Sequence, residues 1–292
     1  MTLEQLRIFI AVAERQHVTR GAEALNLTQS AASASIASLE AQYGTKLFNR
    51  VGRRVVLTEA GQLFLGEARA VLGRVETAEG VLSELSGLKR GTLSVQASQT
   101  IASYWLPRHL VEFRRLHPGI EIRLGIGNTA QVAASVLDGS AEIGFIEGRV
   151  NAPSLASSVV AHDQLIVVVA PGHSWTIEIP TLSGLADGEW VLRERGSGTR
   201  SVFEDALRDA GIPPESLCVV LELPSNEAVR AAVEAGMGAT AISASVAAPS
   251  IEAGLLCHVR VALPERDFSL VHRSERQWSN AAEALMTQLA AG

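Results

Sequence analysis

Small hydroxyl and amide side chains gather at the start of one predicted helix near the N-terminus. Thr28 is a favourable N-cap, and the segment from Gln29 to Tyr43 is rich in helix formers and ends at Gly44. Ser and Gln side chains can hydrogen-bond base edges or phosphates, and a helix N-terminus attracts a phosphate. The candidate nucleic-acid contacts on this helix are Thr28, Gln29, Ser30 and Ser33.

Arginine side chains follow a short distance along the chain. Arg50, Arg53 and Arg54 lie in a short segment that predicts a β-hairpin, a shape that can lie along a phosphate backbone as a wing. Arg20, in the preceding short helix, is a further candidate. Each pattern has a plainer interpretation, because small outward side chains often form a packing face and arginine runs are often only solvated. Spacing alone therefore leaves DNA binding open.

Three predicted helices position these side chains. Apolar residues recur every three or four positions over residues 2–15, Thr19 is expected to cap a second helix that ends at Leu25, and residues 26–27 form a turn. Two helices, a short turn and a third helix match the helix-turn-helix plan. The side chains expected to face the core from the third helix are Ala32, Ile36, Leu39 and Tyr43.

A long helix is predicted from Thr58 to about Leu88, because this segment lacks proline and is rich in helix formers. Its apolar residues follow coiled-coil spacing, which indicates pairing with a second copy of the chain. The alternative is a long helix packed on its own domain. The apolar positions are Leu65, Ala68, Leu72, Val75 and Leu82, and residues 89–91 are expected to form a hinge.

From Thr92 onward, predicted strands and helices alternate, which indicates an α/β domain whose sheet is covered on both faces. The order of elements is similar in two halves, so two lobes with two crossovers and a cleft are expected. The predicted strands are 92–97, 120–126, 143–146, 165–169, 190–192, 219–223, 239–242, 255–259 and 268–271. The predicted helices are one that ends at His117, then 130–138, 199–210, 226–235 and 275–290.

Polar side chains at two predicted helix starts are candidates for binding a small anion in this cleft. They are Ser98, Gln99 and Thr100 after the first strand, and Ser197 and Thr199 in a glycine-flanked segment. Glu147 ends the third strand and is expected to contact a ligand or to pair with Arg149 or Arg195. The plainer interpretations are an ordinary capped loop and a salt bridge in the cleft wall.

Charge and composition exclude several classes of protein. The net charge is −6, but residues 1–58 carry seven basic and four acidic residues (net +3), and residues 91–292 carry fourteen and twenty-two (net −8). Cys218 and Cys257 form no CxxC pair, so neither a disulfide framework nor a zinc site is expected. The seven histidines are scattered and the Gly-Ser-Gly segment lacks a nucleophile elbow, so no catalytic residue and no cofactor are predicted. No apolar run has the length of a membrane helix, and we expect a cytoplasmic protein without a membrane partner.

Three segments together carry a family resemblance: A22-E-A-L-N-L-T-Q-S-A-A-S-A-S-I-A-S-L-E40, G44-T-K-L-F-N-R50 and L57-T-E-A-G61. They resemble the N-terminal signature of LysR-type transcriptional regulators. The resemblance implies a winged helix-turn-helix, a dimerising linker helix and an effector domain like a periplasmic binding protein. Ala34 departs from the pattern, because this outward position is often basic or polar in the family, and direct base readout there is expected to be thin.

The resemblance implies domains at residues 1–58 (DNA binding), 59–90 (linker helix) and 91–292 (effector binding), with lobe I at about 91–161 and 266–292 and lobe II at about 162–265. Ile146-Glu147-Gly148 and Gly196–Arg200 are similar to segments of the regulators of sulfur assimilation and the Calvin cycle, which implies a small anionic effector such as sulfite. The implied partners are a DNA operator, further copies of the chain and RNA polymerase, at the nucleoid. The alternatives are a DNA-binding protein without a ligand and, more remotely, a small-molecule enzyme.

Overall fold

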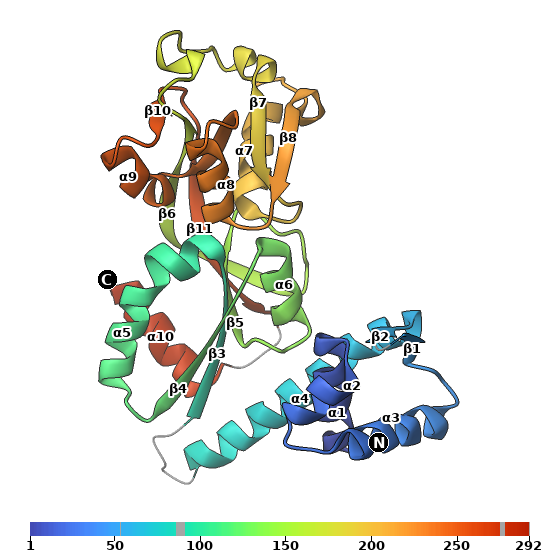
Figure 1. Ribbon diagram of the computed structural model, residues 1–292. Helices are drawn as coiled ribbons and strands as arrows, with labels where there is room; N and C mark the ends of the chain where they lie inside the picture. Colours follow the sequence, from blue (N-terminus) through green and yellow to red (C-terminus); the bar gives the residue numbers. More distant parts are fainter. Residues whose placement is uncertain (53, 86–90, 275–277, 292) are drawn as a thin grey trace. The chain divides into compact units, whose positions relative to one another are not determined.

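The computed structural model describes the chain except residues 53, 86–90, 275–277 and 292 (Figure 1). It divides into two compact units. One unit comprises Met1–Leu88 and the short segment Asp138–Ala141, and the other comprises Lys89–Leu137 and Glu142–Gly292. Within the described residues, no helix is long and apolar enough to cross a membrane.

The N-terminal unit contains the three predicted helices. They are α1 (Leu3–Arg15), α2 (Val18–Glu23) and α3 (Gln29–Tyr43). Thr28 caps α3 by accepting a hydrogen bond from the Ala31 N–H at 3.2 Å, and Gly44 ends the helix in the left-handed region at φ 61°. The prediction that Thr19 caps α2 is wrong, because α2 begins at Val18 and its N-cap is His17, two residues before Thr19.

A two-stranded hairpin and a long helix complete this unit. The strands β1 (Phe48–Val51) and β2 (Arg54–Leu57) pair antiparallel, with Arg50 opposite Val55, and confirm the predicted hairpin. The helix α4 (Glu59–Leu85) follows, with Glu59 in its first turn, where an acidic side chain favours the helix dipole. Arg53 and the expected hinge residues Lys89 and Arg90 lie outside the described residues.

The first half of α4 packs on its own unit. Ala68 is 1% exposed, and Leu65 and Leu72 pack against the buried cluster to which Ala68, Leu6 and Phe9 belong. Three of the five apolar positions assigned to a coiled-coil seam therefore contribute to the core of one chain. For this half of α4, the alternative of a helix packed on its own domain is correct. The apolar spacing alone does not distinguish that alternative from a coiled coil, because it suits packing on the same domain and packing on a second copy of the helix.

The C-terminal unit is built on one nine-stranded mixed sheet. Strands β4, β3, β5, β11, β6, β9, β7 and β8 follow one another across the sheet, and β10 pairs with β6. Their bounds are β3 (Gly91–Ser98), β4 (Ile120–Gly127), β5 (Ile143–Glu147), β6 (Leu155–Val169), β7 (Glu189–Arg193), β8 (Cys218–Leu223), β9 (Ala239–Ser243), β10 (Cys257–Val259) and β11 (Glu265–Arg273). The main helices are α5 (Leu106–Leu116), α6 (Thr129–Leu137), α7 (Gly198–Asp209), α8 (Asn226–Glu234), α9 (Ala244–Glu252) and α10 (Asn280–Ala291).

Two long strands connect the two lobes of this sheet. Nine of the first ten residues of β6 pair antiparallel with β11. The last five pair with β9, and the last three of these also pair with β10. On its other side β11 pairs with β5. The two expected crossovers between the lobes are therefore β6 and β11, which lie side by side in the sheet and can be followed in Figure 1.

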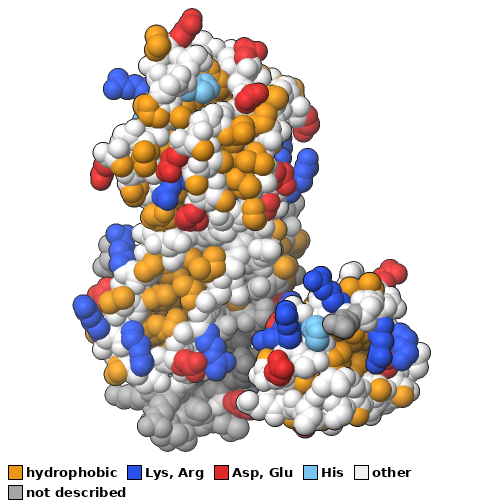
Figure 2. Space-filling view, viewed as in Figure 1, with side chains coloured by type: hydrophobic (Ala, Val, Ile, Leu, Met, Phe, Trp, Pro, Cys, Tyr) orange, Lys and Arg blue, Asp and Glu red, His pale blue; other side chains and the backbone are white. Residues whose placement is uncertain are grey.

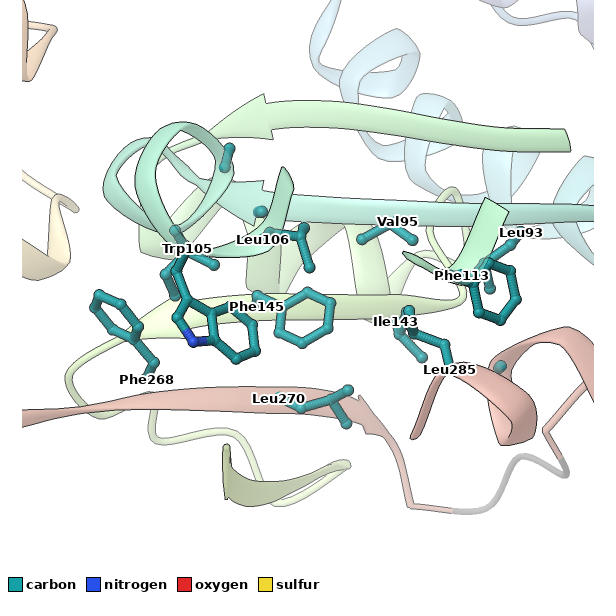
Figure 3. Packing of buried hydrophobic residues seen from close by; sticks show 14 of the residues in the cluster. Leu93, Val95, Trp105, Leu106, Phe113, Ile143, Phe145, Phe268, Leu270 and Leu285 are labelled. Atoms are coloured by element: carbon teal, nitrogen blue, oxygen red, sulfur yellow. The ribbon is translucent and has the colours of Figure 1, made fainter. Parts of the chain in front are cut away.

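Each lobe has its own apolar core. In lobe I, Trp105 packs against Phe145 and Phe268, and Leu285 of α10 belongs to the same cluster (Figure 3). In lobe II, Leu165, Val167 and Val169 of β6 face one cluster, whereas Ile166 and Val168 face another. This alternation confirms a sheet covered on both faces.

Two element predictions were incomplete. The strand predicted over 165–169 begins at Leu155, because the polar stretch before it gains its strand partners from β11. The helix α9 was not predicted, since Pro249 lies inside it and small residues give it little apolar periodicity.

Candidate functional site

The polar side chains predicted for nucleic-acid contact lie at the accessible start of α3. Thr28, Gln29 and Ser30 are exposed, and Ser33 is half-buried. Gln29 Nε2 donates a hydrogen bond to Ser33 Oγ at 2.9 Å, and the Thr28 and Ser30 hydroxyls lie 3.1 Å apart. These bonds limit side-chain freedom, so the donors and acceptors that remain have a preferred direction.

The described cationic candidates are exposed as well. Arg20 lies in α2, Arg50 in β1 and Arg54 in β2, each with an exposed side chain. Lys and Arg side chains are visible on the face of the N-terminal unit that Figure 2 shows. Exposed guanidinium groups on a two-stranded hairpin suit contacts with phosphates.

Glu40 positions this hairpin, and the sequence analysis missed its role. Its carboxylate is buried near the end of α3, where Oε1 accepts hydrogen bonds from the Leu47 and Phe48 N–H groups at 2.9 and 3.2 Å. Lys46 Nζ donates to Oε2 at 2.5 Å. Burial alone raises the pKa of Glu40, but the hydrogen bonds from Lys46, Leu47 and Phe48 outweigh it and lower the pKa below its usual range.

The expected core position at Tyr43 is wrong, and Glu40 takes its place. Tyr43 is 57% exposed, whereas Glu40 is 7% exposed. The spacing from Ala32 and Ile36 to Glu40 is four residues at each step, which puts the carboxylate on the core face of α3. That spacing was the available signal, although a charged residue on an apolar face is easily read as solvated.

The candidate ligand residues of the C-terminal unit surround the Glu147 carboxylate. Glu147 is 2% exposed at the end of β5. Ser98 Oγ donates to its Oε1 at 2.8 Å, and Thr199 Oγ1 and Arg266 Nη1 each donate to its Oε2 at 2.8 Å. Arg266 also pairs with Asp163, with 2.7 Å between Nε and Oδ2. We call Ser98, Glu147, Asp163, Thr199 and Arg266 the Glu147 cluster.

The expected pairing of Glu147 with Arg149 or Arg195 is wrong, because Arg266 is its cationic partner. Arg266 and Asp163 are directly opposite one another on β11 and β6, so strand register brings them together. Burial alone raises the pKa of Glu147, but the positive charge of Arg266 and the hydroxyls of Thr100, Ser98 and Thr199 outweigh it and lower the pKa. The cluster thus brings two buried carboxyl groups and one guanidinium together.

Two of the ligand candidates connect the lobes directly. Gln99 Oε1 accepts from the Asn226 N–H at 3.0 Å, and Gln99 Nε2 donates to the Pro224 carbonyl at 3.0 Å. Thr100 Oγ1 accepts from Asn226 Nδ2 at 3.0 Å. Because these groups already have partners in the other lobe, Gln99 and Thr100 act in this structure as interlobe contacts.

Ser197 is the ligand candidate whose hydroxyl is least engaged. It is 3% exposed at the N-cap of α7, yet its side chain makes no capping hydrogen bond within the described part of the unit. The next residue, Gly198, has no room for a side chain, because an added Cβ would lie 2.3 Å from the Glu147 carbonyl oxygen. Backbone and hydroxyl donors at the start of α7 are therefore held close to β5.

The described residues offer no group of three or more His, Cys, Asp or Glu side chains that could hold a metal ion. Cys218 and Cys257 are free thiols. Around the buried Glu147 carboxylate, the polar groups are the hydroxyls of Ser98 and Thr199 and the guanidinium of Arg266. Arg266, Asp163 and Asn226 were missed by sequence reasoning, since each meets its partner over a long distance in sequence.

Comparison with known families covers nearly the whole chain. Residues 3–62 match the model described as a bacterial regulatory helix-turn-helix protein of the lysR family. Residues 86–292 match the model described as the LysR substrate binding domain.

Named relatives that this chain matches over nearly all of their length agree with these two family matches. The chain is 36% identical over 283 residues to the uncharacterized HTH-type transcriptional regulator YeiE of Escherichia coli (strain K12), covering 96% of this chain and 94% of the relative. It is 33% identical over 291 residues to the HTH-type transcriptional regulator CbbR of Rhodospirillum rubrum, with 99% and 96% covered. A crystal structure of full-length CbnR complexed with target DNA has the same fold, with a TM-score of 0.71, 24% identity, and coverage of 100% and 99%.

Proposed function

Because the chain belongs to the LysR family of DNA-binding transcriptional regulators, we propose that α3 and the β1–β2 hairpin bind an operator and that a small oxyanion in the C-terminal unit modulates this binding. The family assignment supports regulation of transcription and not catalysis, since the relatives carry regulator names. The operator contacts, the ligand and its residues are the proposed part.

For the DNA half, the supporting observation is the exposed row of hydroxyl and amide side chains at the capped start of α3. The proposed contacts are Arg20, Thr28, Gln29, Ser30, Ser33, Arg50, Arg53 and Arg54, of which Arg53 lies outside the described residues. Phosphate contacts from the hairpin supply affinity for any sequence, and the α3 contacts discriminate among operators.

Replacing Arg50 and Arg54 by Ala tests the hairpin assignment. We expect weaker binding to all DNA sequences alike, with the slope of log affinity against log salt concentration reduced by about 1 for each arginine–phosphate ion pair removed. Titration of labelled operator and unrelated DNA at several salt concentrations measures both quantities. An unchanged affinity and slope would contradict the hairpin assignment, and Arg208→Ala in the other unit is a matched control.

For the effector half, the single observation that carries the proposal is a buried set of hydroxyls at two helix starts. Ser98 and Thr100 lie at the start of the π-helical turn Ile101–Trp105, which leads into α5, and Ser197 and Thr199 lie at the start of α7. Hydroxyls and free N–H groups at a helix N-terminus are donors suited to an oxyanion. Sulfite or a related sulfur anion is the favoured candidate. An effector would replace hydrogen bonds that Gln99, Glu147 and the hydroxyls of Ser98, Thr100 and Thr199 now make within the protein.

Ser197→Ala is the cleanest single test of this site, because the Ser197 hydroxyl makes no capping bond in the described structure. We expect a loss of about 1 kcal/mol in anion binding and unchanged stability without ligand. Thermal-shift and calorimetric titrations with sulfite, sulfate, thiosulfate and phosphate measure this in the full chain. Thr199→Val is less clean, since it also removes a donor from Glu147.

Three further proposals complete the assignment. The domain boundaries are residues 1–58, 59–90 and 91–292, with lobes at about 91–161 plus 266–292 and at about 162–265. The chain forms homo-oligomers, as its family does, and the pairing face lies on α4. It acts in the cytoplasm at the nucleoid, where operator binding brings it near RNA polymerase.

A further inference from the structure

Arg193 and Glu194 are neighbours in the chain and form a two-pronged ion pair at the end of β7. Arg193 Nε donates to Glu194 Oε2 at 2.8 Å, and Arg193 Nη2 donates to Glu194 Oε1 at 2.9 Å. The Arg193 side chain is 4% exposed, and a buried guanidinium is destabilising without a compensating charge. Among the residues that the structure describes, Glu194 is the only carboxylate in an ion pair with Arg193. Removing Glu194 therefore leaves a buried positive charge unbalanced.

The same carboxylate reaches the other lobe. Asn128 Nδ2, at the start of α6, donates to Glu194 Oε1 at 3.0 Å. A second bond orients this amide, because Asn128 Oδ1 accepts from the Gln131 N–H at 2.9 Å and thereby caps α6. Burial alone raises the pKa of Glu194, but the hydrogen bonds from Arg193 and Asn128 outweigh it and lower the pKa. Glu194 thus accepts from a guanidinium of lobe II and from an amide of lobe I.

Arg193 connects to lobe I by a second route. Its Nη1 donates to Asn226 Oδ1, and Asn226 Nδ2 donates to Thr100 Oγ1 at 3.0 Å. Two chains of hydrogen bonds therefore lead from one buried guanidinium to two helix starts of lobe I. A carboxylate that accepts bonds from both lobes stabilises the lobe arrangement in which both bonds can form. An external ligand that bridges the lobes would act in the same way.

We propose that Glu194 is a built-in carboxylate ligand of the C-terminal unit, which holds the two lobes together when no effector is bound. Its attachment to β7 gives the carboxylate a high effective concentration beside Arg193, so no dissolved anion is needed. A free carboxylate of the right size takes its place when the side chain is shortened. The proposal goes beyond the proposed function, because it does not depend on the chemical class of the effector.

Glu194→Ala with acetate in solution tests the proposal, because acetate supplies the atoms that the substitution deletes. The Ala130 N–H in the first turn of α6 reports the lobe contact, since it has no partner within its helix and donates to the Gly196 carbonyl at 3.1 Å. We expect hydrogen exchange of this amide in the full-length variant to be about ten-fold faster than in the wild type. Acetate in excess should restore slow exchange, and chloride at the same ionic strength should not.

Glu204→Ala is the matched control. The Glu204 side chain is 22% exposed, against 23% for Glu194, and it likewise pairs with an arginine, Arg200. This pair lies within α7 of lobe II, and Arg200 keeps Glu222 as a second partner. The control should therefore leave exchange of the Ala130 amide unchanged, with and without acetate.

Asn128→Asp tests the lobe I end of the bridge. Aspartate keeps an acceptor for the Gln131 N–H, so the α6 cap is retained, but it lacks the amide donor and repels Glu194. We expect the Ala130 amide to exchange faster in this variant. Acetate should not slow it, because the Glu194 carboxylate still occupies its place beside Arg193.

The outcomes decide the proposal in either direction. Wild-type exchange of the Ala130 amide in Glu194→Ala overturns it. Faster exchange that acetate slows no more than chloride does, or that Glu204→Ala shares, overturns it as well. If Glu194→Ala does not fold even in acetate, Asn128→Asp decides: wild-type exchange in that variant overturns the proposal, and faster exchange supports it.

Discussion

Gln29 and Ser33 form one unit on the exposed start of α3, because the Gln29 amide donates to the Ser33 hydroxyl. The orientation of the Gln29 amide oxygen therefore depends on Ser33, and the orientation of the Ser33 O–H depends on Gln29. We predict that Gln29→Ala and Ser33→Ala have non-additive effects on operator affinity, with a coupling of about 0.5–1.5 kcal/mol. A double-mutant cycle with labelled operator measures it. Gln29→Ala combined with Arg20→Ala is the control pair, and strictly additive losses for Gln29 and Ser33 would count against the unit.

Glu40 joins the end of α3 to the hairpin through three hydrogen bonds to its buried carboxylate. Glu40→Gln is expected to lower the free energy of unfolding of the N-terminal unit by about 1–3 kcal/mol at neutral pH. Since the pKa of Glu40 is lowered in the folded state, its stabilisation is present above the unfolded value of about 4.3 and is lost as the pH falls through the folded pKa.

The difference in stability between wild type and Glu40→Gln should therefore shrink below about pH 4. Denaturant unfolding of the full chain at neutral and acidic pH measures it, with Glu23→Gln, an exposed carboxylate of the same unit, as the control. A difference that stays constant down to acidic pH would show that the carboxylate charge does not matter.

At the scale of elements, α4 has two faces that the apolar spacing does not distinguish. Leu72 packs on the core of its own unit, whereas Leu63 and Val71 are 73% and 38% exposed. We predict that Leu72→Glu destabilises the N-terminal unit by about 2–4 kcal/mol, because it buries a charge without a partner. Val71→Glu should leave this unit folded and weaken self-association.

Sedimentation and thermal unfolding of the full-length variants separate the two effects. Leu63→Glu tests the same exposed face with a second residue. If both exposed-face variants associate like the wild type, the pairing face of α4 is elsewhere. The correction to the predicted seam thus has a direct experimental consequence.

At the scale of the whole molecule, an effector changes DNA affinity only if its binding free energy differs between the DNA-bound and the DNA-free protein. In the effector unit, the lobes are bridged by Gln99, Thr100 and Asn226, and a ligand that exchanges these bonds favours one lobe arrangement. We predict a coupling of about 1–3 kcal/mol between anion and operator binding. Linkage requires that operator DNA change anion affinity by the same factor. Titrating the anion with and without operator, and the operator with and without anion, measures both factors. Equal anion affinities in the presence and absence of DNA would exclude allosteric regulation by that anion.

Sequence alone determined the features that depend on near neighbours in the chain. The Thr28 cap, the Gly44 helix end, the hairpin and the alternating strands and helices follow from local propensity and apolar periodicity, and the family signature lies in the same segments. It also identified Ser98, Glu147 and Thr199 as one candidate group, because strand ends and helix starts meet at one edge of an α/β sheet.

Only the tertiary structure decided the partners of these groups. Arg266 reaches Glu147 because β11 lies between β5 and β6, and Asp163 is opposite Arg266 through the register of β6. The apolar positions of α4 were likewise divided between core and surface by packing against α1. Local patterns specify which residues can form a face or donate a bond. Which strands become neighbours, and in what register, is settled by the free energy of burying the whole sheet, which no local segment contains.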